Sequence, residues 1–238
     1  MSAPQRSYDD LWRGYWGDMQ RHGPVHRHIR EDIVQRVRAL NVETILDVGC
    51  GSGENLAALN EGGRFHLAGV DVSREGIEIA RTRVPSASLS ILNVEREALA
   101  DRFDLVMSIQ VVEHIADDAA ALRNMAKMSR RYVFISTIAG RMRRSEVLTG
   151  HVRNYSTAEL TSKLVSAGLR VVDIRGWGFP FYSPLYRSVV EWLPGGPPAG
   201  PVGRWSQIGA SMVYHLYRLN WPGRGDVISA LAETVSAS

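Results

Sequence analysis

The chain lacks several features that would assign it to a broad class at once. Its 238 residues include a single cysteine, Cys50, so no internal disulfide can form. No apolar run approaches the roughly 18 residues needed to cross a bilayer, and the N-terminus has no apolar core like that of a signal peptide. With 45% hydrophobic and 22% charged residues, the composition is that of a folded globular chain. We therefore expect a single domain in a reducing cytoplasm.

Lysine is also scarce. Lys127 and Lys163 are the only lysines among 28 basic residues, so arginine supplies nearly all of the positive charge. The arginines are scattered and almost balanced by 25 acidic residues, and their densest cluster is only Arg141, Arg143 and Arg144. A net charge of +3 distributed in this way does not favour a nucleic-acid partner.

Tryptophan is missing from the middle of the chain. All six tryptophans fall outside residues 17 to 176: Trp12, Trp16, Trp177, Trp192, Trp205 and Trp221. The middle instead alternates short β-rich runs with helical patterns, which is typical of an α/β, doubly wound sheet covered on both faces. The predicted strands lie at 44–48, 65–70, 89–92, 103–108, 132–136, 169–174 and 226–232. The predicted helices lie at about 27–40, 54–60, 74–83, 117–128, 156–168 and 206–219.

A glycine-rich turn after the first predicted strand carries the strongest functional signal. The run Asp47-Val48-Gly49-Cys50-Gly51-Ser52-Gly53-Glu54 leads a buried strand into a helix, and such turns aim free N–H groups at a ligand. A dinucleotide fingerprint needs glycine where Glu54 stands, and this acid would repel a pyrophosphate. No P-loop lysine follows either, so the turn suits a ligand without phosphates.

Asp71 is the second feature that indicates a ligand site. It ends the next predicted strand, 18 positions after Gly53, where an acid can accept both hydroxyls of a ribose. Taken singly, Asp71 or Asp47 could merely cap a turn or a helix. Together, the strand, glycine turn, helix, strand and acid indicate a nucleoside ligand.

These motifs, with the run Val111-Val112-Glu113-His114-Ile115 after the fourth strand, resemble those of class I S-adenosylmethionine-dependent methyltransferases of the small-molecule, ubiquinone-pathway-like branch. The resemblance spans about residues 40–175. It implies a mostly parallel, seven-stranded Rossmann-like sheet whose last strand is antiparallel. The implied cofactor is S-adenosyl-L-methionine. Its implied binding residues are Asp47, Gly49, Cys50, Gly51, Gly53, Asp71, Val72, Asn93, Val94 and Gln110. The family usually has aspartate where this chain has Asn93, whose amide oxygen can still pair with an adenine amino group.

The positions of the tryptophans, together with the extent of this resemblance, predict a domain of three parts. Residues 1–40 form a helical N-terminal lid and lead-in helix, residues 41–175 the cofactor-binding core, and residues 176–238 an aromatic acceptor-side insertion with a helix and the last strand. Tyr8, Trp12, Tyr15 and Trp16 are expected to cover one side of the acceptor, and residues 179–192 the other. These aromatic ends could equally be satellite cores or a subunit interface.

Two histidines are candidate catalytic bases. His114 follows the fourth strand at the carboxyl edge of the sheet, and His151 precedes a capped helix in a segment that resembles the family's active-site rim. The alternatives are packing or capping for His114 and loop tethering for His151. His22, His26 and His28 lie close together, but no compact set of cysteine and carboxylate partners completes a site, so no metal is expected.

The acceptor is expected to be a small, apolar or aromatic metabolite methylated at O, N or C. The chain has no Asn/Asp-Pro-Pro-aromatic loop after the fourth strand, which disfavours nucleobase amines. A lipid or quinone acceptor at a membrane surface, with peripheral contact by residues 177–192, stays open, as does a homodimer. The competing functions are an NAD(P)-dependent reductase and a non-catalytic cofactor-binding module.

Overall fold

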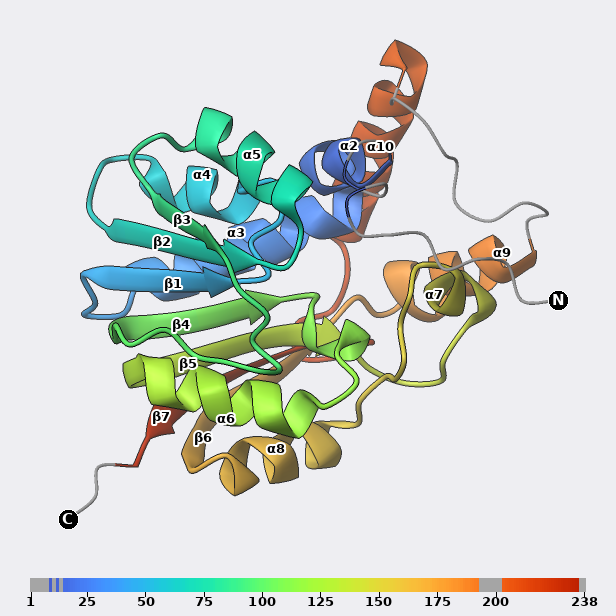
Figure 1. Cartoon of the computed structure of the whole chain (residues 1–238). Coiled ribbons are helices and arrows are strands. Elements are labelled where there is room, and N and C mark those ends of the chain that lie inside the picture. The colour runs from blue at the N-terminus through green and yellow to red at the C-terminus, as the bar shows by residue number, and fades with distance from the viewer. Residues whose placement is uncertain (1–8, 10–11, 13–14, 193–202, 236–238) are drawn as a thin grey trace, which may run out of the picture.

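The centre of the protein is a seven-stranded sheet with strand order β3-β2-β1-β4-β5-β7-β6 (Figure 1). The computed structural model describes residues 9, 12, 15–192 and 203–235. The strands are β1 (Thr44–Val48), β2 (His66–Asp71), β3 (Ser88–Ile91), β4 (Phe103–Ile109), β5 (Ser129–Ile138), β6 (Leu169–Trp177) and β7 (Val227–Thr234). β1 to β5 pair in parallel, and β7 runs antiparallel between β5 and β6. The predicted doubly wound sheet with an antiparallel last strand is confirmed.

Helices cover both faces of this sheet (Figure 1). One face carries α3 (Pro24–Arg38), α4 (Glu54–Asn60) and α5 (Arg74–Arg83), and the other carries α6 (Asp118–Met128) and α8 (Thr157–Ser166). Because the central strands are buried on both sides, they are nearly continuous apolar runs, as in β1, where Ile45, Leu46 and Val48 are all buried. This is the physical reason that the strands were visible in the sequence.

Side-chain caps start several of the helices where the sequence predicts them. The Ser73 hydroxyl accepts a hydrogen bond from the Gly76 N–H at the start of α5. Ser156 and Glu159 form a reciprocal capping box at the start of α8. These caps fix the points at which the chain leaves the carboxyl edge of the sheet.

Several short helices were not predicted by residue range, although a helical N-terminal segment was expected. α2 (Tyr15–His22) falls within residues 1–40, for which helix was expected, and it contains Gly17. A helical glycine costs only about 1 kcal/mol, which packing of α2 on α3 can offset. The short elements α7 (Arg144–Leu148), η2 (Phe181–Tyr186) and α9 (Arg187–Trp192) also lie outside the predicted set. α10 (Arg204–Tyr217) matches the helix predicted near 206–219.

The elements that position the site meet at the carboxyl ends of the parallel strands. The short 3-10 helix η1 (Val112–His114) follows β4 at this edge, and α7 and α9 lie beyond it (Figure 1). Trp12, which is buried, packs on the glycine turn after β1. Within the described residues, no helix has both the length and the apolar character needed to cross a membrane.

Candidate active site

The glycine turn has a backbone that other residues adopt only under strain. Gly49, Gly51 and Gly53 have φ values of 78°, 50° and 76°. A Cβ atom on Gly49 would lie 2.4 Å from a Val111 methyl, and one on Gly51 would lie 2.1 Å from the Trp12 ring. The turn therefore needs glycine for its conformation and for the close approach of two neighbouring segments.

Asp71 holds this turn in place. Its Oδ2 accepts a hydrogen bond from the Gly51 N–H, and its Oδ1 accepts one from the Ser73 N–H, both at 2.8 Å. Burial raises the pKa of the Asp71 carboxyl, while these backbone donors oppose the rise. The capping role considered from the sequence is thus present, and Asp71 also lines the cavity described next.

A cavity of about 330 Å³ lies against the turn and the ends of β1, β2 and β4. Six of the ten predicted cofactor-binding residues line it: Gly49, Asp71, Val72, Asn93, Val94 and Gln110. Trp12 and Trp16 line it from the N-terminal segment. The sequence therefore located this cavity, although binding by the individual residues stays a prediction.

The other four predicted cofactor residues support the turn from behind. Cys50 is buried and its N–H donates to the Val70 carbonyl, while Gly51 lies under Trp12 and Gly53 precedes α4. Asp47 is fully buried, and neither carboxyl oxygen has a hydrogen-bond partner among the described residues. Burial, together with the negative charge of Asp71, raises the pKa of Asp47 to about 8. Unsatisfied buried carboxyl groups are uncommon in folded proteins, and this one directly precedes Val48 and Gly49, which line the cavity.

A second cavity, of about 280 Å³, adjoins the first. Trp16, Gln20, Gln110 and His114 line both cavities. Gln110 has a φ of 57°, which is uncommon for a residue other than glycine, and its N–H donates to the Ser136 carbonyl at 2.7 Å. The segment that begins at Gln110 is therefore held in an unusual conformation where the two cavities meet.

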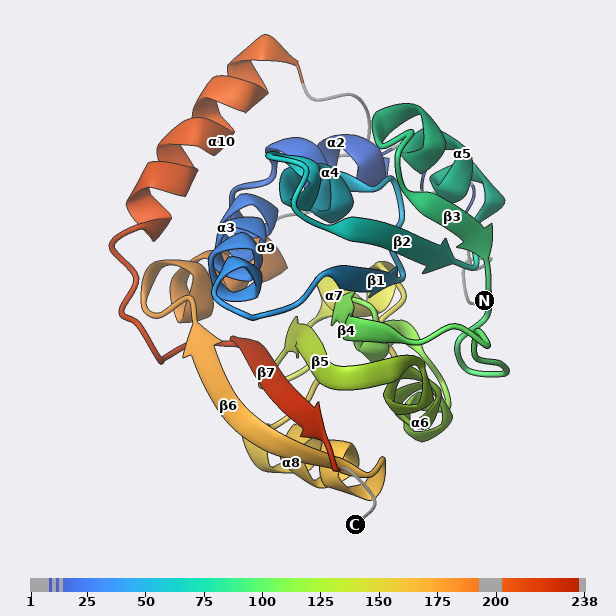
Figure 2. The ribbon, with the colours of Figure 1, turned by 90° about the vertical axis from the view of Figure 1, so that its left-hand side faces the viewer.

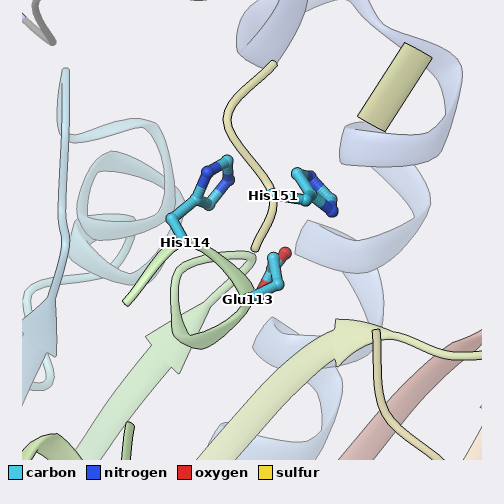
Figure 3. Close-up of side chains that lie close together, drawn as sticks. All are labelled: Glu113, His114 and His151. Carbon is cyan, nitrogen blue, oxygen red and sulfur yellow. The ribbon is translucent and has the colours of Figure 1, made fainter. Parts of the chain in front are cut away.

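Glu113, His114 and His151 gather beside the second cavity (Figure 3). The two imidazole ring centroids are 4.6 Å apart, and the three side chains offer ligand atoms that all lie within 4.8 Å of one another. The Nδ1 atoms of both histidines and Oε1 of Glu113 are buried without a hydrogen-bond partner in the described part of the chain. The structure thus brings together the two predicted candidate bases.

Burial keeps both histidines neutral. It lowers the pKa of His114 to about 4, with the neighbouring His151 adding to the effect. Burial also lowers the pKa of His151, although Glu146 and Asn154 oppose the change. Each neutral imidazole keeps a lone pair, but its lowered pKa makes it a weaker base than a free imidazole.

Sequence reasoning missed Glu113. This side chain is fully buried; its Oε2 accepts a 2.8 Å hydrogen bond from the Thr137 hydroxyl, and burial raises its pKa to about 7. The only signal in the sequence was its position next to His114, because nothing in the pattern marks an acid after β4 as buried. Among the described residues, Glu113, His114 and His151 form a group that could hold a metal ion; His22, His26 and His28 form no such group. The absence of a metal stays a prediction.

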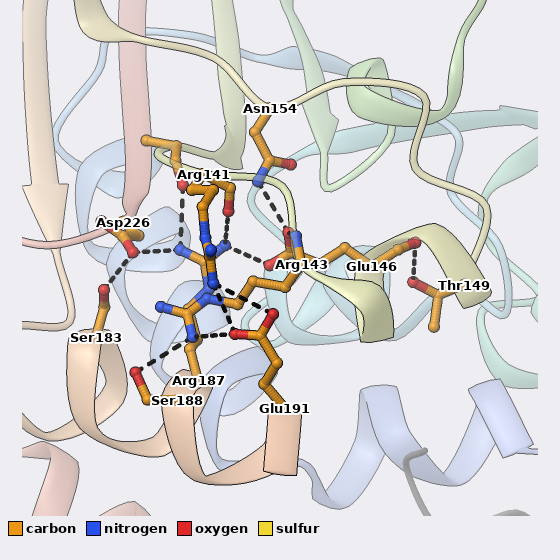
Figure 4. Close-up of polar contacts among 11 residues, drawn as sticks. Arg141, Arg143, Glu146, Thr149, Asn154, Ser183, Arg187, Ser188, Glu191 and Asp226 are labelled. Carbon is orange, nitrogen blue, oxygen red and sulfur yellow. Dashed lines mark hydrogen bonds and ion pairs between the residues drawn. The ribbon is translucent and has the colours of Figure 1, made fainter. Parts of the chain in front are cut away.

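Arg187 lines the second cavity and belongs to a network of polar contacts (Figure 4). This buried side chain pairs with Glu146 and Asp226 and donates to the Ala139 carbonyl at 3.1 Å. Glu146 also accepts a hydrogen bond from the Asn154 side chain at 2.9 Å. The positive charge of Arg187 is therefore balanced inside the protein.

The aromatic ends only partly match their predicted places. Trp16, Tyr182 and Tyr186 line the second cavity, and the Trp16 ring lies 5.8 Å from the His114 ring. Phe179, expected in the acceptor wall, instead packs on Trp221 at 5.5 Å. Tyr8 and the side chains of Tyr15 and Trp192 lie outside the described residues.

Comparison with known proteins decides the family. A family model described as a methyltransferase domain matches residues 15–174. The chain belongs to this methyltransferase family. The sequence-based prediction of an S-adenosylmethionine-dependent methyltransferase is thereby confirmed, and neither the reductase nor the non-catalytic alternative is favoured.

The chain is also similar in sequence or in fold to several known methyltransferases. A ubiquinone biosynthesis O-methyltransferase from Coxiella burnetii is 26% identical over 71% of this chain and 82% of its own length. A putative methyltransferase solved in complex with the Haloferax volcanii Trm112 activator has the same fold, with a TM-score of 0.63 and 18% identity over 96% of this chain and 98% of that one. The magnesium protoporphyrin IX methyltransferase of Synechocystis, solved with bound SAH, has a TM-score of 0.59 and 12% identity over 98% of this chain and 90% of that one.

Proposed function

We propose that this methyltransferase transfers the methyl group of S-adenosylmethionine to a hydroxyl oxygen of a small, uncharged aromatic molecule. The observation that carries the proposal is the meeting of the two cavities at His114, whose Nδ1 is buried without a partner among the described residues. The relative from Coxiella burnetii, named as an O-methyltransferase, supports oxygen as the acceptor atom.

The first cavity is the proposed cofactor site. Asp71 would accept the ribose hydroxyls, Val72 and Asn93 would flank the adenine, and Gly49 would allow the close approach of the methionyl part. When bound, the cofactor supplies a methyl group on a positively charged sulfur, ready for in-line displacement. The protein mainly has to align the acceptor, so the second cavity decides which molecule reacts.

A hydroxyl acceptor has to lose its proton during the transfer, and His114 or His151 is proposed to take it. Burial lowers the pKa of His114 to about 4, so the ring is neutral at physiological pH and keeps a lone pair for the proton. The low pKa also makes the ring a weak base, so the imidazolium needs a partner that stabilises it. Glu113 lies close enough to stabilise the imidazolium that forms. A positioned base of this kind contributes about 10²- to 10⁴-fold to the rate.

Charge in the second cavity favours an uncharged acceptor. Arg187 is already paired with Glu146 and Asp226, so an acidic acceptor would have to compete with two carboxylates for this cation. Trp16, Met19 and Tyr182 supply apolar and aromatic surface on the same cavity. A phenol-like ring with a neutral hydroxyl fits this combination.

The test is methyl transfer from radiolabelled S-adenosylmethionine to acceptors that share one aromatic ring and differ in one group. We expect transfer to the hydroxyl compound, little to the amine and least to the carboxylate. His114→Ala and His151→Ala should lower kcat by about 10²-fold or more while leaving the Kd for the cofactor within about threefold. His66→Ala, which changes an exposed histidine at the start of β2, is the matched control.

Two results would contradict the proposal. One is preferential methylation of the carboxylate, because it would require Arg187 to be available to the acceptor. The other is unchanged kcat in both histidine variants, which would assign His114 and His151 to packing and loop tethering.

A further inference from the structure

α10 carries a stripe of large apolar side chains that face solvent. In this helix and the turn after it, Trp205 is 84% exposed, Met212 70% and Leu219 63%, and Ile208 and Leu216 are exposed as well. At about 100° of rotation per residue, these five side chains fall within an arc of roughly 80°. Trp221 is also exposed, just beyond the helix. A soluble chain seldom presents so many large apolar residues along one line.

The stripe lies on the side of α10 that turns away from the protein. The inner side is fixed by Tyr214 and Tyr217, both buried, and their positions lie roughly opposite the stripe on the helical circle. The Tyr214 ring stacks on His28, and its hydroxyl donates to Glu31 of α3. Figures 1 and 2 show α10 along the outside of the molecule, with its N-terminal end extending past the other helices. The helix is therefore held on one side, and among the described residues, which do not include 193–202 just before it, nothing covers its apolar stripe.

The charged residues in the sequence interval that contains the stripe are all basic, while Glu31 of α3 contacts the opposite side of the helix through Tyr214. No acidic residue occurs between Glu191 and Asp226, whereas Arg204, Arg218, Arg224 and His215 all fall in this interval. His215, Arg218 and Arg224 are exposed. Trp205 and Trp221 lie near the two ends of the stripe. Tryptophan is enriched in protein segments that lie at a membrane–water interface.

We propose that α10 is a membrane-surface helix that binds an anionic lipid bilayer, with Trp205, Met212 and Leu219 inserted among the lipids and Arg218 and Arg224 near the headgroups. Positive charge without nearby acids on this segment is complementary to a negatively charged bilayer surface. The apolar stripe then loses its contact with water on binding. This surface is separate from the segment 177–192 that the sequence suggested for membrane contact.

Vesicle flotation of the full chain tests this proposal. The probes are vesicles of phosphatidylcholine alone and vesicles with about 30% phosphatidylglycerol. We expect the protein to float with the anionic vesicles at low salt and to bind them at least about tenfold more weakly when the ionic strength is raised to about 1 M. Equal flotation with neutral and anionic vesicles would overturn the electrostatic part of the assignment.

Matched variants locate the binding surface. Met212→Glu with Leu219→Glu should weaken binding to anionic vesicles by about tenfold or more. Val165→Glu with Val172→Glu, at exposed positions on α8 and β6, should leave it unchanged. Arg218→Gln with Arg224→Gln should selectively reduce the part of binding to anionic vesicles that is sensitive to salt. Circular dichroism and thermal unfolding establish that each variant is folded before its binding is compared.

Two outcomes would remove α10 as the membrane surface. If both pairs of glutamate substitutions weaken flotation equally, binding does not depend on the stripe. If the wild-type chain sediments as a dimer, the Met212→Glu and Leu219→Glu variant is monomeric and neither floats, the stripe is a protein–protein interface. Because flotation requires no acceptor and no turnover, a failure of the proposed methyl transfer would leave this test unaffected.

Discussion

Glu113→Gln should make the protein more stable at neutral pH and less active. Glu113 is fully buried, and only one of its two carboxyl oxygens has a hydrogen-bond partner in the described structure. Glutamine has nearly the same shape, and its amide oxygen can still accept the hydrogen bond from Thr137. The substitution therefore removes the ionisable group while keeping the packing.

The size of the effect follows from the pKa of Glu113, which burial raises from its ordinary value of 4.5 to about 7. Between these two values the folded protein holds a proton that the unfolded chain has lost, so the free energy of unfolding falls as the pH rises. The stabilisation is fully present below about pH 4.5 and is lost as the pH passes through about 7. At about 1.4 kcal/mol for each pKa unit, the total change is roughly 3 kcal/mol.

The assay is urea unfolding of both proteins at several pH values between about 5 and 8. Taking the difference between wild type and variant cancels the contributions of other buried carboxyl groups, such as Asp47. Between these limits, the wild type should lose about 2–3 kcal/mol of stability relative to the variant. If the free energy of unfolding changes with pH in the same way in both proteins, the argument that Glu113 is forced to ionise in an apolar site is refuted.

The same variant tests the proposed role of Glu113 in catalysis. If the carboxylate stabilises an imidazolium on His114 or His151, kcat should rise in the wild type as the pH passes through about 7, and this rise should be absent from Glu113→Gln. An unchanged pH profile would leave Glu113 with a structural role only.

Two further predictions concern the cofactor site and metals. Gly51→Ala should weaken S-adenosylmethionine binding by at least about tenfold and destabilise the fold by more than about 1 kcal/mol, because alanine would be strained at a φ of 50° and would meet the Trp12 ring. Gly62→Ala is the control for backbone strain alone, because Gly62 has a φ of 92° and no atom lies within 4 Å of the added Cβ. If calorimetry gives the two variants equal affinity for S-adenosylmethionine, the clash with Trp12 does not explain the loss of binding. Dialysis against a chelator should leave methyl transfer unchanged, because His114 itself is the proposed proton acceptor; activity that is lost and then restored by a divalent cation would assign Glu113, His114 and His151 to a metal instead.

The core of the fold could be predicted because its signals are local. Strands covered on both faces have to be apolar along their length, and helices such as α5 and α8 begin at side chains that cap them. The glycine turn was visible for the same reason, since the positive φ values of Gly49, Gly51 and Gly53 require that residue type locally. A turn and an acid at the ends of neighbouring strands were enough to locate the first cavity.

The second cavity could not be predicted because its contacts join distant parts of the chain. Arg187 meets Glu146, 41 positions earlier, and Asp226, 39 positions later. No periodicity reveals that two carboxylates balance this arginine, or that Phe179 turns toward Trp221 and away from the cavity. Glu113 was missed for a related reason, since its burial depends on β5, whose Thr137 contacts it from 24 positions further along the chain.

One contact links the two cavities and gives Gly49 a second role. The absence of a side chain at Gly49 admits the Val111 methyl groups, and the Val111 carbonyl accepts a hydrogen bond from the His114 N–H at 2.9 Å. The strained φ of Gln110 directs the chain into this position. A larger residue at Gly49 would therefore displace the segment that carries His114 as well as narrow the first cavity. The cofactor turn and the proposed base are coupled through Val111, so the geometry of one depends on that of the other.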